Sequence, residues 1–158
     1  MCIRDRAEAA VGVGFGPACN QGARAGQADF ILFLNPDTVL HDDTLIGAVA
    51  ALEADSRNAV VGIRLQEPSG TTQRSCARFP TLTSLLMRST GLDRMPGLAP
   101  FGYPMREWDH AESRDVDHVI GAFYLVRRDV FEQVQGFDER FFVSVSYTHL
   151  TLPTSFLV

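Results

Sequence analysis

The sequence contains no lysine, few cysteines and no long apolar run. All 14 of its basic residues are arginine, which excludes a P-loop lysine and a Schiff-base lysine. Its three cysteines, Cys2, Cys19 and Cys76, are far apart and form no CxxC pair. We therefore expect neither a disulfide framework nor a zinc site, and a reducing compartment fits best. No run approaches the roughly 18 apolar residues of a membrane-spanning helix.

The charge and composition describe an acidic globular chain. Its 158 residues suit one domain, and 46% hydrophobic with 21% charged residues is ordinary for a folded protein. The formal net charge of −5 argues against a nucleic acid bound through its phosphates, which requires clustered positive charge. The first 20 residues carry charges and lack the continuous apolar core of a signal peptide. We expect a cytoplasmic protein, with the inner face of the membrane as an alternative location.

Residues 30–34, Phe-Ile-Leu-Phe-Leu, predict a strand buried on both faces, because five apolar residues are too few for a helix of ordinary length. Pro36 ends this strand, since it has no amide proton to donate to a neighbour. Asp37 then lies at the carboxyl end of the strand, where open α/β sheets bind ligands. Its oxygens suit Mg²⁺ or Mn²⁺. Asn-Pro-Asp is also a common turn sequence, and that alternative stays open.

The rest of the chain predicts further helices and strands. Apolar spacings of three and four residues indicate a helix from Asp42 to Ala54, capped by Asp42 or Asp43. His41 beside this acidic pair suggests a metal site, but a solvated helix start explains the same residues. The other expected elements are a helix over 17–25, a strand over 59–65, a turn at 68–70 with a return strand over 71–79, helical turns over 82–87, a long loop over 91–108, a strand over 115–126 and a helix over 127–134.

Several short motifs occur in a specific order along the chain. They are Gly14-Phe15-Gly16 with Asn20-Gln21-Gly22, Leu34-Asn35-Pro36-Asp37-Thr38, Gly62 with Gln73-Arg74-Ser75, Val116-Asp117 with Gly121-Ala122, Arg127-Arg128, and Gly136-Phe137-Asp138-Glu139-Arg140-Phe141-Phe142. In this order and spacing they resemble the family 2 glycosyltransferases, especially the bacterial rhamnosyltransferase-like branch. The resemblance implies a GT-A fold, an α/β fold whose mostly parallel sheet is flanked by helices and binds a nucleoside-diphosphate sugar.

The resemblance also implies roles for individual residues. Asp37 would hold Mg²⁺ or Mn²⁺ against the donor diphosphate. The donor side would comprise Asn20, Gly22, Asn35 and Asp37, and the acceptor side Gly121, Ala122 and Asp138.

Other roles for these residues remain open from the sequence alone. Asn20 could cap or bond nearby backbone, Gly121-Ala122 could be part of a tightly packed strand, and Asp138 could cap a turn. We expect His118 to be structural, and Arg127-Arg128 to brace the fold or to form a solvated helix start.

The two ends of the chain depart from the family pattern. An inverting sugar transfer needs a general base, and in the family an acidic element follows the Phe-Phe pair. Here no acidic residue follows Glu139, so the expected base after Phe142 is missing. The family's first strands are missing too, and residues 1–6 and 144–154 resemble translated adapter sequence. We expect a partial family 2 domain over 7–143 with non-native ends at 1–6 and 144–158.

Such a partial domain would lack a neighbour for the strand at Ile31 and leave an unpaired apolar edge. We therefore expect the chain as written to be marginally folded and inactive. The leading interpretation is a fragment of a metal-dependent inverting glycosyltransferase that moves a sugar, plausibly rhamnose, from a nucleoside-diphosphate donor to a cell-surface glycan or lipid-linked acceptor.

Two other classes of protein compete with this interpretation. One is a non-catalytic sugar-nucleotide-binding or interaction module on the same scaffold. The other is a dinucleotide-binding oxidoreductase, suggested by residues 12–16. Pro17 occupies the last glycine position of that fingerprint, so the sequence gives the oxidoreductase little support.

Overall fold

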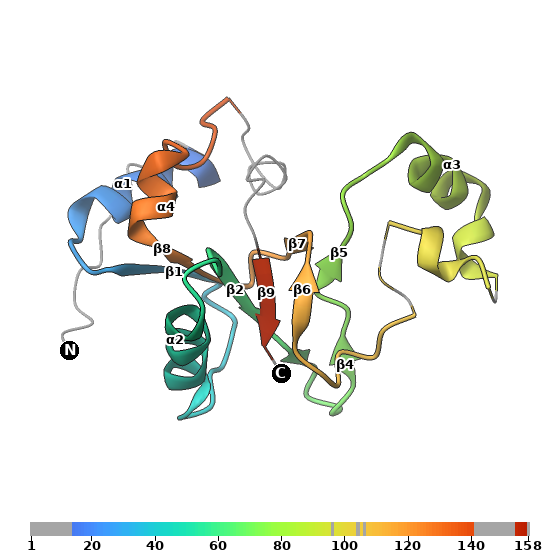
Figure 1. Cartoon of the computed structure of the whole chain (residues 1–158), viewed down its shortest axis with the longest axis horizontal. Helices are drawn as coiled ribbons and strands as arrows, with labels where there is room; N and C mark the ends of the chain where they lie inside the picture. The colour runs from blue at the N-terminus through green and yellow to red at the C-terminus, as the bar shows by residue number, and fades with distance from the viewer. Residues whose placement is uncertain (1–13, 96, 104, 106, 141–153, 158) are drawn as a thin grey trace.

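The computed structural model describes residues 14–95, 97–103, 105, 107–140 and the backbone of 154–157. Four α-helices, two short 3-10 helices and nine strands occur in this part of the chain (Figure 1). In chain order they are α1 (Phe15–Ala25), β1 (Phe30–Leu34), α2 (Thr44–Ala54), β2 (Val60–Ile63), β3 (Leu65–Gln66), β4 (Thr72–Gln73), β5 (Cys76–Ala77), α3 (Leu82–Thr90), η1 (Leu92–Arg94), η2 (Ala99–Phe101), β6 (Arg114–Val116), β7 (His118–Val119), β8 (Phe123–Arg127), α4 (Arg128–Gln133) and β9 (Thr154–Leu157). No helix among the described residues is long and apolar enough to cross a bilayer.

The main sheet has the strand order β1-β8-β2-β9-β6 and confirms the expected α/β class. Strand β8 runs antiparallel to both neighbours, β1 and β2. These two strands are therefore parallel to each other, as a crossover through α2 requires, but β8 lies between them. Strand β9 pairs parallel with β2 and antiparallel with β6. The expectation of a mostly parallel sheet is thus wrong for the described ladders, because a strand distant in sequence inserts with reversed direction.

Helices cover the β1–β8 part of the sheet on both faces (Figure 1). Ile31 and Phe33 of β1 pack in one core cluster with residues of α1 and α4, and Phe123 and Leu125 of β8 pack in the other with α2. Successive side chains of a strand point to opposite faces, so β8 is buried on both. Within the described sheet β1 is an edge strand paired with β8, as expected for the strand at Ile31.

Arg127 and Arg128 brace these two layers from the end of β8. Arg127 donates to the carbonyl oxygens of Leu52 in α2 and of Asn58 after it. Arg128 donates from Nη1 to the carbonyl oxygen of Ala23 in α1, at 2.9 Å. Each arginine therefore satisfies a carbonyl in the last turn of a helix, where a positive charge also complements the helix dipole. This confirms the expected bracing role.

The expected strand over 115–126 is divided into three parts. The first two parts are β6 and β7, and a turn at Gly121 and Ala122 separates them from the third part, β8. β7 pairs with β5, while β8 belongs to the main sheet. The interpretation of Gly121-Ala122 as part of a packed strand is therefore wrong. At β7, Val119 lies so close to Gly62 that a Cβ on Gly62 would come within 2.7 Å of the Val119 side chain, so this position requires glycine.

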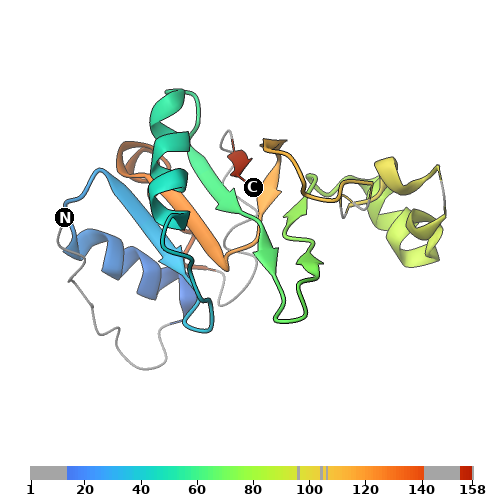
Figure 2. The same cartoon turned by 90° about the horizontal axis from the view of Figure 1, so that it is seen from below.

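The chain between Phe79 and Phe101 forms a separate helical lobe, which extends away from the main sheet (Figure 2). The lobe consists of α3, η1 and η2. Thr81 and Ser84 form a reciprocal capping box at the start of α3, and Gly91 ends the helix with φ of 75°. The predicted helical turns over 82–87 thus extend to Thr90, and the predicted long loop contains two short helices.

Candidate functional site

Asp37 lies on a closed turn directly after β1. The last ladder pair of β1 joins Leu34 to Phe123, and the amide of Asn35 then donates to the carbonyl oxygen of Ala122 at 3.0 Å. The amide of Thr38 donates back to the carbonyl oxygen of Asn35 at 3.1 Å and closes the turn over Pro36 and Asp37. The turn alternative is therefore correct as local structure, and it leaves the Asp37 side chain exposed beyond the sheet.

The same hydrogen bond joins two predicted halves of the site. Asn35 was predicted on the donor side, and Gly121 and Ala122 on the acceptor side. The antiparallel pairing of β1 with β8 places the end of one strand against the start of the other. Gly121 and Ala122 have small side chains and are half-buried, so backbone rather than bulky side chains lines this side of the Asp37 turn.

An aromatic cluster supports β1 just before this turn. The ring of Phe33 lies 4.9 Å from that of Phe137 and 5.4 Å from that of Phe131, measured between centroids. Phe131 and Phe137 are themselves 5.4 Å apart, nearly at right angles. Edge-on aromatic pairs of this kind contribute about 0.5–1.5 kcal/mol beyond burial. The cluster fixes the strand two residues before Asn35.

The structure gives Asn20 a structural position in α1. Its Nδ2 donates to the carbonyl oxygen of Phe137 at 2.8 Å and to Oε1 of Glu139 at 3.0 Å. Its Oδ1 accepts from the amide of Phe137 at 2.9 Å. The side chain is buried, and both of its amide hydrogens are used. These bonds reach distant backbone rather than the nearby backbone that the capping alternative required. A donor contact by Asn20 stays a prediction.

Gly22 lies two residues after Asn20 in α1 and is exposed to solvent. A Cβ at this position would meet no atom within 4 Å. Packing therefore does not require glycine here, although glycine in a helix interior costs about 1 kcal/mol relative to alanine. Its predicted donor contact remains untested by the geometry.

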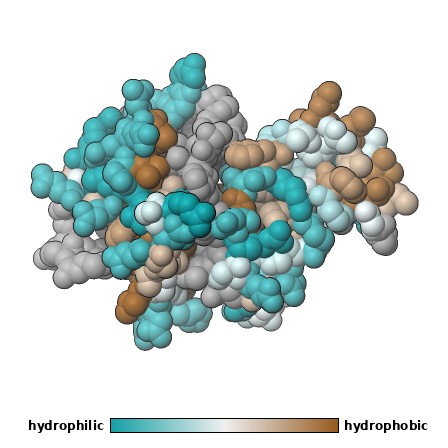
Figure 3. All heavy atoms as spheres, in the orientation of Figure 1, coloured by the Kyte–Doolittle hydropathy of each residue, from teal (hydrophilic) through white to brown (hydrophobic). Residues whose placement is uncertain are grey.

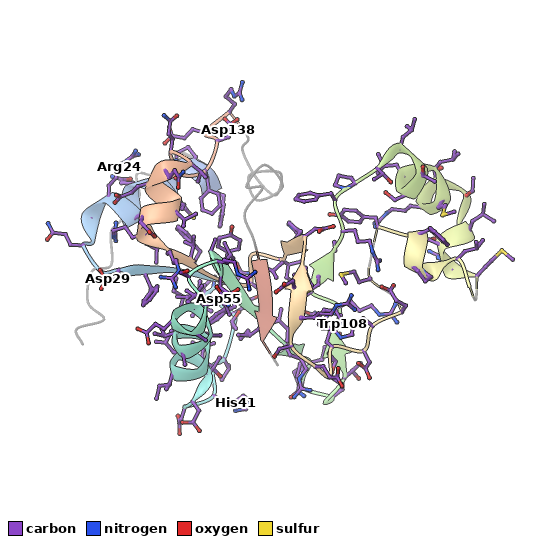
Figure 4. The ribbon with its side chains drawn as sticks, in the orientation of Figure 1. Arg24, Asp29, His41, Asp55, Trp108 and Asp138 are labelled. Atoms are coloured by element: carbon purple, nitrogen blue, oxygen red, sulfur yellow. The ribbon has the colours of Figure 1, made fainter. Side chains whose placement is uncertain are left out.

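Asp138 belongs to the segment after α4, at the outer edge of the α1–α4 layer (Figure 4). Its Oδ1 accepts from the amide of Arg140 at 3.0 Å and from Nε of the same residue at 2.9 Å. The carboxylate therefore closes a local turn, as the capping alternative stated. Asp138 lies on a different element from the Asp37 turn, and its acceptor-side role stays a prediction.

Two histidines, His118 and His41, lie next to aspartates in the sequence. His118 is half-buried in β7, and burial lowers its pKa below the ordinary value, so the ring is neutral at physiological pH. This fits the expected structural role. His41 is exposed before α2 (Figure 4), and Asp43 occupies the N-cap position without a side-chain capping hydrogen bond. The prediction of Asp42 or Asp43 as the cap is thus confirmed in position by Asp43, although its side chain makes no capping hydrogen bond.

Metal ligands in the described part of the chain are sparse. No three of its His, Cys, Asp or Glu side chains gather into a group that could hold a metal ion. A site at Asp37 built from the described residues would therefore use one or two protein side chains, which is a usual arrangement for Mg²⁺ when substrate phosphates supply other ligands. The segment after Phe142, in which the expected general base is missing, lies outside the described residues.

The fold and site together define an α/β domain with an acidic turn at the carboxyl end of a buried strand, the position where such sheets bind ligands. Residues 8–135 match the family model described as Glycosyl transferase family 2. The chain therefore belongs to that family, which confirms the resemblance found in the sequence.

Two of three similar curated relatives are named as rhamnosyltransferases, and the third is named as an O-antigen biosynthesis protein. The chain is 29% identical over 150 residues to N-acetylglucosaminyl-diphospho-decaprenol L-rhamnosyltransferase of Mycobacterium tuberculosis, covering 83% of this chain and 46% of the relative. It is 30% identical to O-antigen biosynthesis protein RfbC of Myxococcus xanthus, covering 86% and 10%. It is 30% identical to rhamnosyltransferase WbbL of Escherichia coli K12, covering 76% and 43%. The chain spans less than half the length of these relatives.

Proposed function

We propose that this chain carries the donor-binding part of a metal-dependent, inverting glycosyltransferase. The donor is a nucleoside-diphosphate sugar, with dTDP-rhamnose as the specific candidate because two of the relatives are named as rhamnosyltransferases. The acceptor is a cell-surface glycan or a lipid-linked sugar. The observation that carries the proposal is the hydrogen bond between Asn35 and Ala122, which joins the acidic turn to the small-residue turn.

Asp37 is the residue that would hold Mg²⁺ or Mn²⁺. The ion would neutralise negative charge on the departing diphosphate. The exposed carboxylate fits this role because such ions bind through one or two carboxylates together with substrate phosphates. The hydrogen-bonded turn contributes by holding the carboxylate in a fixed place before the donor arrives, so less ordering is needed on binding.

Gly121 and Ala122 act by leaving space. Glycine has no Cβ and alanine only a methyl group, so a sugar would be able to approach the backbone beside the Asp37 turn. The ring of Phe33 in β1 lies 6.3 Å from that of its ladder partner Tyr124 in β8, a contact that supports the pairing of the two strands beside these turns.

The test is calorimetric titration of dTDP-rhamnose into the 158-residue chain with and without Mn²⁺. We expect Asp37→Asn, which keeps the shape and removes the charge, to weaken binding at least about tenfold in Mn²⁺. EDTA should weaken the wild type similarly and should not weaken the variant further. Asp42→Asn is the matched control, since Asp42 is also an exposed aspartate in a turn five residues away. Donor binding that is insensitive to both EDTA and Asp37→Asn would contradict the proposal.

A further inference from the structure

The helical lobe between Phe79 and Phe101 carries most of the exposed apolar surface of the described chain. Ten large hydrophobic side chains are exposed in the described part of the chain, and seven of them belong to the lobe. The seven are Phe79, Leu82, Leu85, Leu86, Leu92, Met95 and Phe101. Figure 3 shows the apolar side chains gathered over this part of the molecule. Concentrated patches of this kind mark interaction surfaces, whereas single exposed leucines are ordinary.

The lobe buries some polar side chains and exposes apolar ones, the reverse of an ordinary small core. Its buried positions include the polar residues Ser84 and Asp93, each 3% exposed or less. Leu82 and Leu86, by contrast, are 86% and 63% exposed. Leu82, Leu85 and Leu86 have helical spacings of three and four residues, so they share one face of α3. That face points to solvent, while the buried residue of α3 is the polar Ser84.

Positive charge accompanies this apolar face. Arg88 and Arg94 are exposed on the lobe, and Arg88 lies over the ring of Tyr103 at 5.8 Å. Residues 79–101 contain two arginines and one acidic residue, which makes the lobe net +1 in a chain of net −5. The one acidic residue is Asp93, whose side chain is buried. The exposed surface of the lobe is therefore cationic as well as apolar.

We infer that this lobe binds the surface of a bilayer that contains anionic phospholipids. The leucines of α3 enter the boundary between headgroups and acyl chains, and the arginines contact lipid phosphates. An exposed helix face of leucine flanked by arginine is typical of interfacial helices. Pairing of the same face between two copies is disfavoured, because it would bring the arginines of both copies together without an exposed acid from the lobe. The inference does not rest on sugar transfer.

Flotation of the 158-residue chain with lipid vesicles tests the inference. The probes are vesicles of phosphatidylcholine alone and of phosphatidylcholine with phosphatidylserine. The test variant is the double substitution Leu82→Gln and Leu86→Gln. The matched control is Val39→Gln with Ile46→Gln, which removes two equally exposed apolar side chains at β1–α2. All four residues are exposed, so circular dichroism spectra should match the wild type and show that folding is retained.

We expect binding to anionic vesicles and much weaker binding to neutral ones. The Leu82→Gln/Leu86→Gln variant should lose at least about tenfold in vesicle partitioning, and the control should keep wild-type partitioning. Arg94→Gln should cost about fivefold on anionic vesicles only. Three results would each overturn the inference. They are absence of flotation, an equal loss of partitioning in both double variants, and a Leu82→Gln/Leu86→Gln variant that keeps wild-type partitioning but no longer self-associates in analytical ultracentrifugation.

Discussion

The buried bonds of Asn20 make a direct prediction about stability. The Asn20→Ala substitution removes one acceptor and two donors from the contact between α1 and the segment after α4. The amide and carbonyl of Phe137 then lose their two buried hydrogen bonds to the Asn20 side chain. Because Phe137 also packs on Phe33, the effect should spread to β1.

The expected cost follows from the hydrogen bonds that are lost. Loss of a hydrogen bond at a buried backbone group costs about 1–3 kcal/mol, so the two bonds to Phe137 together are worth about 2–6 kcal/mol. Alanine is a better helix former than asparagine, which returns roughly 0.5 kcal/mol. Typical domains have an unfolding free energy of about 5–15 kcal/mol, so the variant should lose a large share of its stability.

Urea unfolding followed by circular dichroism measures this loss. The neighbouring exposed residue supplies the control, and Gln21→Ala should change the unfolding free energy by less than about 0.5 kcal/mol. Under conditions where Asn20→Ala remains folded, a structural role predicts donor affinity within about twofold of wild type. Unchanged stability combined with a large loss of donor affinity would refute this reasoning and assign Asn20 to the donor site.

Three further predictions concern glycine and histidine. Gly22→Ala should raise the unfolding free energy by about 0.5–1 kcal/mol, because a Cβ meets nothing there, and a simultaneous loss of donor affinity would indicate donor contact. Gly136→Ala should lower the unfolding free energy by at least about 2 kcal/mol, because Gly136 has φ of 76° and a Cβ would lie 2.5 Å from Oδ1 of Asn20. The cost should be smaller in an Asn20→Ala background, which removes that oxygen. Equal costs in both backgrounds would exclude the clash as the cause. For His118, whose folded pKa is lowered, the unfolded chain binds the proton more tightly, so stability should be level above about pH 7 and fall as pH drops through about 6.5 toward the folded value. His118→Phe should reduce that slope, and an unchanged slope between about pH 7 and pH 5 would assign the dependence to other groups.

Local signals in the sequence predicted the elements near the site but not their pairing. The apolar run over 30–34 ended by Pro36 gave β1 with the bounds observed, and helical periodicity gave α2 to within two residues at its start. The insertion of β8 between β1 and β2 has no local signal, because its partner residues lie far away in the sequence. The mostly parallel sheet was for that reason mispredicted.

Long-range contacts also limited the prediction of the site. The order of motifs selected Asp37, Gly121 and Ala122 as candidate site residues. The pairing of β1 with β8 brings the turns that carry them together. The partner of Asn20 lies 117 residues further along the chain, so local reasoning could only suggest capping. Bracing by Arg127 and Arg128 was one of two roles left open, and the structure supplies the partners in α2 and α1 that the sequence could not name.

Electron paramagnetic resonance of Mn²⁺ in the presence of thymidine diphosphate tests the central claim most directly. The free aquated ion gives a strong signal, which falls when protein and nucleotide bind the metal together. We predict that wild type and Asp42→Asn lower this signal beyond the effect of nucleotide alone, because Asp37 and the diphosphate share the ion. Asp37→Asn should leave it at the nucleotide-only value. An equal fall with Asp37→Asn and wild type would show that the Asp37 carboxylate does not hold the metal.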